Sequence, residues 1–157
     1  MEVMNRSCIS LKGIGKSFIH NGQVCAVMSG VDFAVESGET CAIIGASGSG
    51  KSTLLNIIGL LDFADEGEYL FMGCPVSNTQ SDELAHLRKM EIGFVFQHFN
   101  LIPRLSVLEN VALPLRYRGM DRAHSLERAL GMLQRVGMAQ RAGYKPADLS
   151  GGQKQRV

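Results

Sequence analysis

Gly45-Ala46-Ser47-Gly48-Ser49-Gly50-Lys51-Ser52 is the stretch that decides the fold of this 157-residue sequence. It fits the pattern G-x-x-x-x-G-K-[ST]. The apolar run 41–44 before it predicts a strand that is covered on both faces, and the pattern from Lys51 onward predicts a helix. A strand, a glycine-rich turn and a helix in this order are the start of an α/β unit.

This loop predicts a site for the phosphates of a nucleoside triphosphate. Its glycines let backbone N–H groups turn inward, and the helix start adds partial positive charge. Lys51 supplies a full positive charge, and the Ser52 hydroxyl is a ligand for Mg²⁺. The candidate contacts are Gly45, Ala46, Ser47, Gly48, Ser49, Gly50, Lys51, Ser52 and Thr53. The alternative, an ordinary glycine-rich turn with a surface lysine, leaves the flanking strand and helix without explanation. The loop alone does not separate GTPases, kinases and ATPases.

The rest of the first two thirds also has an α/β pattern. Apolar and polar residues alternate over 31–36, which predicts a strand with one buried face, and residues 37–39 supply a turn. Residues 68–72 and 92–96 predict two more strands. A short helix is expected between them, opening at Ser81 with acids at its positive end.

The last third has a helical pattern. Ser106 and Glu109 form a capping box, and Gly137 is a plausible helix stop. Before Gly137, Leu126, Leu130 and Leu133 are expected on one helical face, with Ala129 and Val136 beside them. Lys145-Pro146 predicts a second interruption of the helical structure. We therefore predict a helical region from about residue 100 to 157.

Composition excludes several classes of function. Sixteen basic and fifteen acidic residues leave a net charge of +1, so the chain has no basic field for nucleic acid. The first residues lack an apolar targeting stretch, and the densest apolar run, 54–61, is too short to span a bilayer. We therefore expect a cytoplasmic protein.

The cysteines and histidines suggest no metal or disulfide site. Cysteines 8, 25, 41 and 74 form no C-x-x-C pair, and we expect them to be reduced and to fill space in the fold. Histidines 20, 86, 98 and 124 have no metal-ligand spacing with one another or with cysteine. We assign them no role.

A second motif narrows the class. Leu149-Ser150-Gly151-Gly152-Gln153, followed by Lys-Gln-Arg-Val, resembles the signature sequence of ABC ATPases at every core position. In physical terms Ser150 is an N-cap, Gln153 closes a capping box, and Gly151 and Gly152 present N–H groups at a helix start. The motif is thus a second anion receptor. A merely capped helix start is the alternative, but it does not explain the pairing with a phosphate loop.

Two further residues gain a role from this resemblance. Gln97 follows the predicted strand 92–96 and resembles the family's Q-loop glutamine, whose amide oxygen holds Mg²⁺ or the attacking water. Phe18 occupies the place where the family stacks an aromatic residue on adenine. Without the resemblance, Gln97 would be a surface residue and Phe18 a core residue.

The resemblance implies an α/β fold, that of a P-loop NTPase with an ABC-type nucleotide-binding domain. Its parts would be a RecA-like core with an antiparallel β subdomain over 1–96, and a Q-loop and helical subdomain over 97–157. The domain would be incomplete, since the family's hydrolytic acid, catalytic Glu and switch His follow the signature. Asp62 ends an apolar run but continues the helix from Lys51, so we expect it to be a surface residue. The chain by itself is therefore expected to bind Mg²⁺ and ATP without appreciable hydrolysis.

The segments Phe94–Gln97, Asn100–Pro103 and Leu108–Pro114 most resemble the LolD/MacB group of this family. That group implies a membrane permease as partner, met around residues 97–105, and a location at the inner face of the cell membrane. It also implies export or membrane extraction of a substrate, and a homodimer that sandwiches ATP. Two alternatives stay open: a nucleotide-binding module without turnover, and an ABC ATPase of DNA repair or translation. The near-zero net charge argues against the latter.

Overall fold

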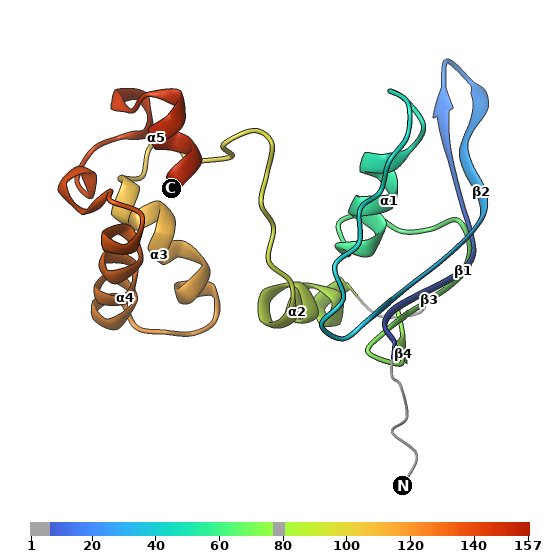
Figure 1. The fold of residues 1–157 in the computed structure, drawn as a ribbon, viewed down its shortest axis with the longest axis horizontal. Helices are drawn as coiled ribbons and strands as arrows, with labels where there is room; N and C mark the ends of the chain where they lie inside the picture. The colour runs from blue at the N-terminus through green and yellow to red at the C-terminus, as the bar shows by residue number, and fades with distance from the viewer. Residues whose placement is uncertain (1–6, 77–80) are drawn as a thin grey trace, which may run out of the picture. The chain divides into compact units, whose positions relative to one another are not determined.

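The computed structural model describes residues 7–76 and 81–157. Residues 1–6, where we expect no targeting segment, lie outside the described part. The chain forms two compact units, Met1–Arg88 and Lys89–Val157, here called unit 1 and unit 2 (Figure 1). Among the described residues, all strands lie in unit 1, and unit 2 is helical. The predicted boundary after Phe96 concerns the functional subdomains and stays a prediction.

Unit 1 contains one antiparallel sheet with the strand order β2-β1-β3-β4. Its strands are β1 (Ser7–His20), β2 (Gln23–Glu36), β3 (Glu66–Phe71) and β4 (Cys74–Pro75). Two-residue turns with positive φ at both positions join β1 to β2 and β3 to β4, at Asn21-Gly22 and Met72-Gly73. Such turns match the twist of a hairpin. The antiparallel β subdomain expected from the sequence is present. The predicted strand 31–36 is confirmed, and the predicted strand 68–72 is confirmed up to Phe71, since Met72 lies in the turn.

At Gly67 the backbone of β3 lies very close to the backbone of β1. Gly67 has φ +91°, and a Cβ built there would lie 2.5 Å from the carbonyl oxygen of Lys12 and 2.6 Å from that of Gly13. Backbone atoms cannot move aside as a flexible side chain can. This close approach of the two backbones therefore requires glycine.

Unit 1 also contains α1 (Lys51–Ile58) and most of α2 (Ser81–Glu91), whose last three residues belong to unit 2. The helix starts predicted at Lys51 and Ser81 are thus confirmed. The buried Tyr69 hydroxyl donates to the carbonyl oxygen of Ile58 at 2.7 Å, which ties β3 to the end of α1. The core comprises Leu11, Ile14, Leu54, Ile57, Leu60, Tyr69, Phe71, Val76 and Leu84. This core holds α1 in place and thereby positions the loop that precedes it.

Two strand predictions are wrong. Residues 41–44 and 92–96 have no assigned strand, and most of their side chains are exposed, with Ile44 91% and Val95 95% accessible. A strand needs a neighbour for its ladder hydrogen bonds. All strands of the described residues belong to the antiparallel sheet β2-β1-β3-β4, so neither apolar run has a strand partner there.

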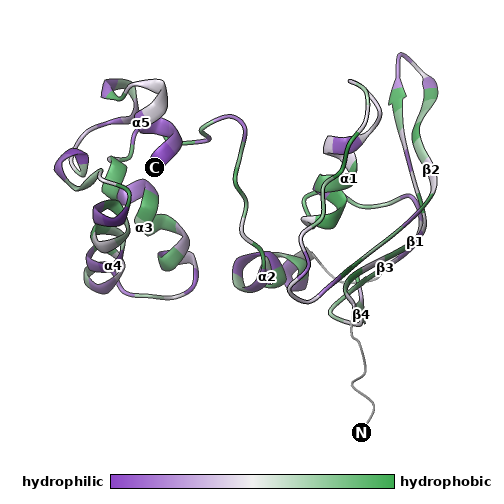
Figure 2. Ribbon diagram, in the orientation of Figure 1, coloured by the Kyte–Doolittle hydropathy of each residue, from purple (hydrophilic) through white to green (hydrophobic). Residues whose placement is uncertain are grey.

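Unit 2 contains α3 (Val107–Tyr117), α4 (Arg122–Arg135) and α5 (Gly151–Arg156), with short 3₁₀ helices η1 (Ala139–Arg141) and η2 (Pro146–Asp148). In the ribbon of Figure 2, α3 contains more hydrophobic residues and α4 more hydrophilic ones. The cluster of buried residues consists of Val107, Leu133, Met138 and Leu149. The predicted apolar face of α4 is partly wrong: Ser125, Ala129 and Leu133 are buried, whereas Leu130 is 37% and Val136 40% exposed.

In unit 2, the residues that start α3 and end α4 are those predicted from the sequence. Ser106 and Glu109 form the expected capping box at the start of α3. Gly137 has φ 69° just after the C-cap of α4 and ends that helix.

Alanine substitution at the two positive-φ glycines Gly67 and Gly73 tests the close approach of β3 to β1. A Cβ at Gly73 would meet nothing within 4 Å, so Gly73→Ala is expected to lose only about 1–2 kcal/mol of unfolding free energy through its left-handed backbone. Gly67→Ala is expected to lose about 1–3 kcal/mol more, because its Cβ overlaps backbone atoms. Urea unfolding of both variants measures the difference. Equal losses of unfolding free energy in the two variants would show that position 67 tolerates a side chain.

Candidate functional site

The loop before α1 has the backbone that the glycine pattern predicts. Gly48 and Gly50 have φ 80° and 86°, in the region that favours glycine. A Cβ at Gly45 would lie 2.7 Å from the Ser49 hydroxyl oxygen. All residues of the loop from Gly45 to Ser49 are exposed. The loop is thus a tight curve whose backbone faces solvent.

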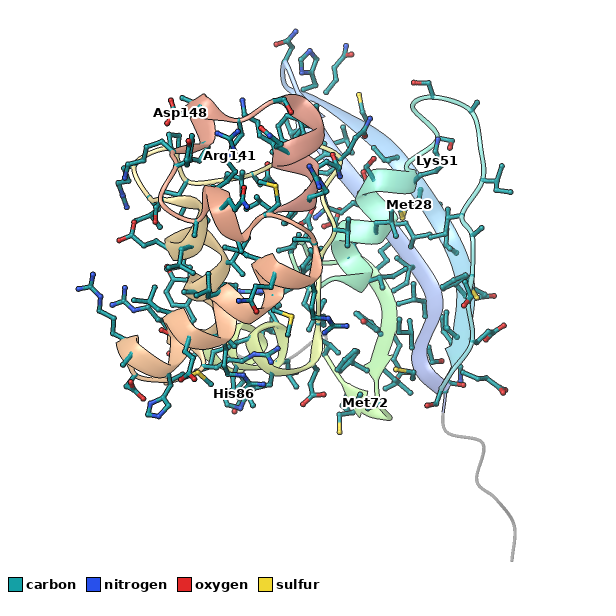
Figure 3. All side chains as sticks on the ribbon, turned by 60° about the vertical axis from the view of Figure 1, so that its left-hand side comes forward. Met28, Lys51, Met72, His86, Arg141 and Asp148 are labelled. Carbon is teal, nitrogen blue, oxygen red and sulfur yellow. The ribbon has the colours of Figure 1, made fainter. Side chains whose placement is uncertain are left out.

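The Lys51 ammonium lies within this curve. Its Nζ donates to the carbonyl oxygens of Gly45 at 2.9 Å and Ala46 at 2.6 Å. Figure 3 shows Lys51 on the first turn of α1 and Met28 on the neighbouring strand β2. The Met28 methyl would be 3.3 Å from a Cβ at Gly50, so β2 packs directly against the start of the helix.

The start of α1 is suited to an anion. Its N-cap is Gly50, which provides no side-chain hydrogen bond, and its first turn contains no acidic residue. The first N–H groups of the helix are therefore free of a side-chain cap, and the helix dipole adds positive charge. Ser52 is exposed on this turn and Thr53 is half-buried. Together with Lys51, these groups fit a Mg²⁺-bound polyphosphate.

Phe18 lies on β1 and is 44% exposed. It pairs with Cys25 of β2, close to the hairpin turn. In Figure 1 this end of the hairpin and the loop before α1 lie at the same end of unit 1. The aromatic ring is therefore not a core residue, and its exposed part is available to a ligand.

A charged cluster beside Phe18 is absent from the sequence predictions. The Lys16 Nζ donates to Asp62 Oδ1 at 3.1 Å, to the Phe63 carbonyl at 2.7 Å and to Asp65 Oδ1 at 3.2 Å. Asp62 is thus a partner of a buried lysine and not simply the surface residue that we predicted. The residues are 46 to 49 positions apart, and no local pattern signals such a pairing.

Hydrogen bonds and charge set the pKa values in this cluster. The hydrogen bond from the backbone N–H of Ser17, followed by that from Lys16, lowers the pKa of Asp65. Burial by itself would lower the pKa of Lys16, but the hydrogen bonds to Asp62 and Asp65 outweigh it, so this pKa is raised. Lys16 and Asp65 are both charged at neutral pH.

The signature residues form the predicted cap in unit 2. The Ser150 Oγ accepts from the Gln153 N–H at 3.3 Å, and the Gln153 Oε1 accepts from the Ser150 N–H at 2.9 Å. Gly151 and Gly152 are exposed at the start of α5. The motif therefore presents its glycines to solvent, as an anion receptor requires.

Gln97 is exposed in the unpaired stretch after α2. Two residues on, the Phe99 ring lies 4.0 Å from a Cβ built at Gly151, and the Lys154 ammonium is 5.9 Å from the ring centroid. The segment that carries Gln97 thus reaches the signature within unit 2. Sequence reasoning did not single out Phe99.

Asn110 is a second residue that sequence reasoning missed. Its side chain accepts from the Ile102 N–H at 2.7 Å and donates to the carbonyl oxygens of Ile102, Leu105 and Ser106. These bonds fix the loop between Gln97 and α3. An asparagine inside an amphipathic helix gives no sequence signal for such a role.

Cys25, Cys41 and Cys74 are free and exposed, so the expectation that cysteines fill space is wrong for these three, and Cys8 is half-buried. Within residues 7–76 and 81–157 no cluster of potential ligands could hold a metal ion. No helix in the same residues has the length and apolar character needed to cross a bilayer.

Sheet, loop and helical unit define a P-loop nucleotide-binding domain, and comparison with known proteins specifies its family. A family model described as ABC transporter matches residues 28–157. The macrolide export ATP-binding/permease protein MacB of Pasteurella multocida is 46% identical over 99% of this chain and 24% of the relative. The pyoverdine export ATP-binding/permease protein PvdT of Pseudomonas syringae is 49% identical over 98% of this chain and 24% of the relative. The chain thus spans about a quarter of the length of these relatives.

Solved structures agree with the family match. The dimeric post-hydrolysis structure of the ATP-binding cassette MJ0796, bound to ADP and Pi, is 41% identical with a TM-score of 0.86. The match covers 94% of this chain and 66% of that chain. The chain therefore belongs to the ABC transporter family, and within it to the LolD/MacB type of ATP-binding domain. The α/β ABC nucleotide-binding fold predicted from the sequence is confirmed in its described part.

The lowered pKa of Asp65 predicts a contribution to stability that depends on pH. Because its pKa is lower in the folded than in the unfolded chain, Asp65 stabilises the fold fully above about pH 5. The contribution is lost as pH falls through the folded pKa. Between about pH 6 and 3, the protein should therefore lose more stability than Asp65→Asn does. Thermal unfolding over this range measures the effect, with Asp82→Asn as a control for removal of one acid. Parallel curves for the protein and Asp65→Asn would contradict this assignment.

Proposed function

We propose that this chain is the ATP-binding part of an ABC transporter that exports or extracts a substrate through a partner permease. Residues from Gly45 to Thr53 bind the phosphates, with Lys51 as the strongest single contact. Phe18 stacks on the adenine. Ser52 and Gln97 bind Mg²⁺, which neutralises phosphate charge when bound. The observation that carries the proposal is the Lys51 ammonium inside an exposed loop at an uncapped helix start.

The signature is proposed to bind the γ-phosphate of ATP that is held by a second copy of the chain. Ser150, Gly151, Gly152 and Gln153 supply a hydroxyl, an amide and backbone N–H groups on unit 2, whereas the phosphate loop is on unit 1. Two copies related by a two-fold axis place each loop against the other's signature. The dimeric MJ0796 cassette supports this arrangement.

The proposed permease partner is supported by the relatives. MacB and PvdT are described as ATP-binding/permease proteins for export, and this chain spans only about a quarter of each. We propose that the complete protein hydrolyses ATP at the cytoplasmic face of the membrane. The permease contacts the region around residues 97–105, and the substrate is recognised by the permease.

Lys51→Ala tests the phosphate site. A hydrogen bond from a charged group contributes about 1.5–3 kcal/mol, so removal of the ammonium should weaken Mg·ATP binding about ten- to a hundredfold. Calorimetric titration measures the dissociation constant. Lys12→Ala removes an exposed lysine of the same unit and should leave the affinity unchanged. Equal affinities for the protein and Lys51→Ala would exclude the loop as the binding site.

Dimerisation of the complete protein tests the role of the signature. A non-hydrolysable ATP analogue should promote dimers and ADP should not, because only the γ-phosphate reaches the second copy's signature. Ser150→Arg should abolish dimerisation by filling this receptor while leaving nucleotide binding to the monomer intact. Sedimentation velocity measures the dimer fraction. Dimers of Ser150→Arg equal to those of the unchanged protein would show that Ser150 does not lie in the interface.

A further inference from the structure

Lys16 is a buried charge to which the proposed function gives no role. It is 9% exposed, and among the described residues it is the one buried residue that carries a formal charge. A buried ammonium is costly unless acceptors surround it. Lys16 lies on β1, two residues before Phe18, so its ammonium is close enough to act on the Phe18 ring.

The acceptors around Lys16 fix its position completely. The ammonium has three protons, and the three acceptors within hydrogen-bond distance are Asp62 Oδ1, the Phe63 carbonyl oxygen and Asp65 Oδ1. All of them belong to the segment that follows α1. Lys16 therefore joins β1 to the end of the helix that starts at the phosphate loop.

Asp65 also holds the backbone around Lys16. Its Oδ2 accepts from the Ser17 N–H at 2.7 Å, and its own N–H donates to the Gly15 carbonyl at 2.9 Å. The β1–β2 register shifts between Lys16 and Ser17, where the ladder alone would leave the strand poorly fixed. Three successive residues are thus held in place just before Phe18.

The Lys16 ammonium also contacts the ring. Nζ lies over Phe18 at 5.3 Å from the ring centroid, within the range of a cation–π interaction. The ring is 44% exposed, which leaves surface for a flat ligand to stack on. The same cation is therefore bound to the helix side of unit 1 and to the ring.

We propose that Lys16 is a positioning residue for the base of the bound nucleotide. With its acceptors Asp62 and Asp65, it keeps the Phe18 ring at a fixed place relative to the phosphate loop at the other end of α1. The cluster thereby selects for a ligand whose flat base and phosphates span this distance. The inference rests on the proposed stacking of Phe18 on adenine.

The test compares a ligand that has a base with one that has none. Lys16→Met keeps the aliphatic stem and removes the charge. It should weaken Mg·ATP binding about two- to tenfold, because the ring loses its cation contact and its fixed position. Binding of Mg·tripolyphosphate, which uses only the phosphate loop, should be unchanged. A loss of overall fold would weaken both ligands, so the ratio separates positioning from stability.

A double-mutant cycle shows whether Lys16 acts through the ring. Phe18→Leu should weaken Mg·ATP and leave Mg·tripolyphosphate unchanged. Adding Lys16→Met to Phe18→Leu should have no further effect on Mg·ATP, because the ring through which Lys16 acts is gone. If Lys16→Met does not fold, Asp62→Asn removes one anchor of Lys16 and should give a smaller, base-selective loss.

The outcomes separate the two ideas. If Phe18→Leu leaves Mg·ATP affinity unchanged, the stacking proposed for Phe18 is wrong and the role of Lys16 falls with it. If Phe18→Leu weakens Mg·ATP but the effects of the two substitutions multiply, stacking stands and the positioning role is overturned. Equal weakening of Mg·ATP and Mg·tripolyphosphate by Lys16→Met that is folded, or by Asp62→Asn if Lys16→Met is not, also overturns it.

Discussion

The left-handed backbone at Gly48 and Gly50 is the constraint on which the rest of the site depends. A residue with a Cβ would lose about 1–2 kcal/mol at each such position, and more at Gly50, where Val27 and Met28 of β2 leave little room. With glycine, the chain turns sharply enough to enclose the Lys51 ammonium and to start α1 without a side-chain cap. Positive charge and open N–H groups are thus concentrated at one exposed point of unit 1.

The remainder of unit 1 holds this point in place through contacts between distant parts of the chain. Tyr69 binds the last turn of α1 from β3, and Lys16 binds the segment after α1 from β1. Both donors are buried side chains, for which a satisfied polar group is stabilising and an unsatisfied one is costly. The sheet therefore supports both ends of the proposed nucleotide site, the phosphate loop and the ring of Phe18.

Sequence reasoning predicted the features that depend on neighbouring residues. The capping boxes at Ser106 and Ser150 and the helix stop at Gly137 are local, because their partners lie within a few residues. Asn21-Gly22 is also a local hairpin signal that was available in the sequence and was not used. Features that depend on distant partners were missed: the cluster of Lys16 has no local pattern, and the apolar runs 41–44 and 92–96 predicted strands whose pairing the pattern could not supply.

The most direct test of the central claim is a crystal structure of the protein with Mg²⁺ and a non-hydrolysable ATP analogue. The account predicts that the β- and γ-phosphates lie within hydrogen-bond distance of the N–H groups from Gly48 to Ser52. The Lys51 ammonium should leave the carbonyl oxygens of Gly45 and Ala46 for the phosphates, and the adenine should stack on Phe18. A triphosphate bound elsewhere, with Lys51 still bound to those two carbonyl oxygens, would contradict the account.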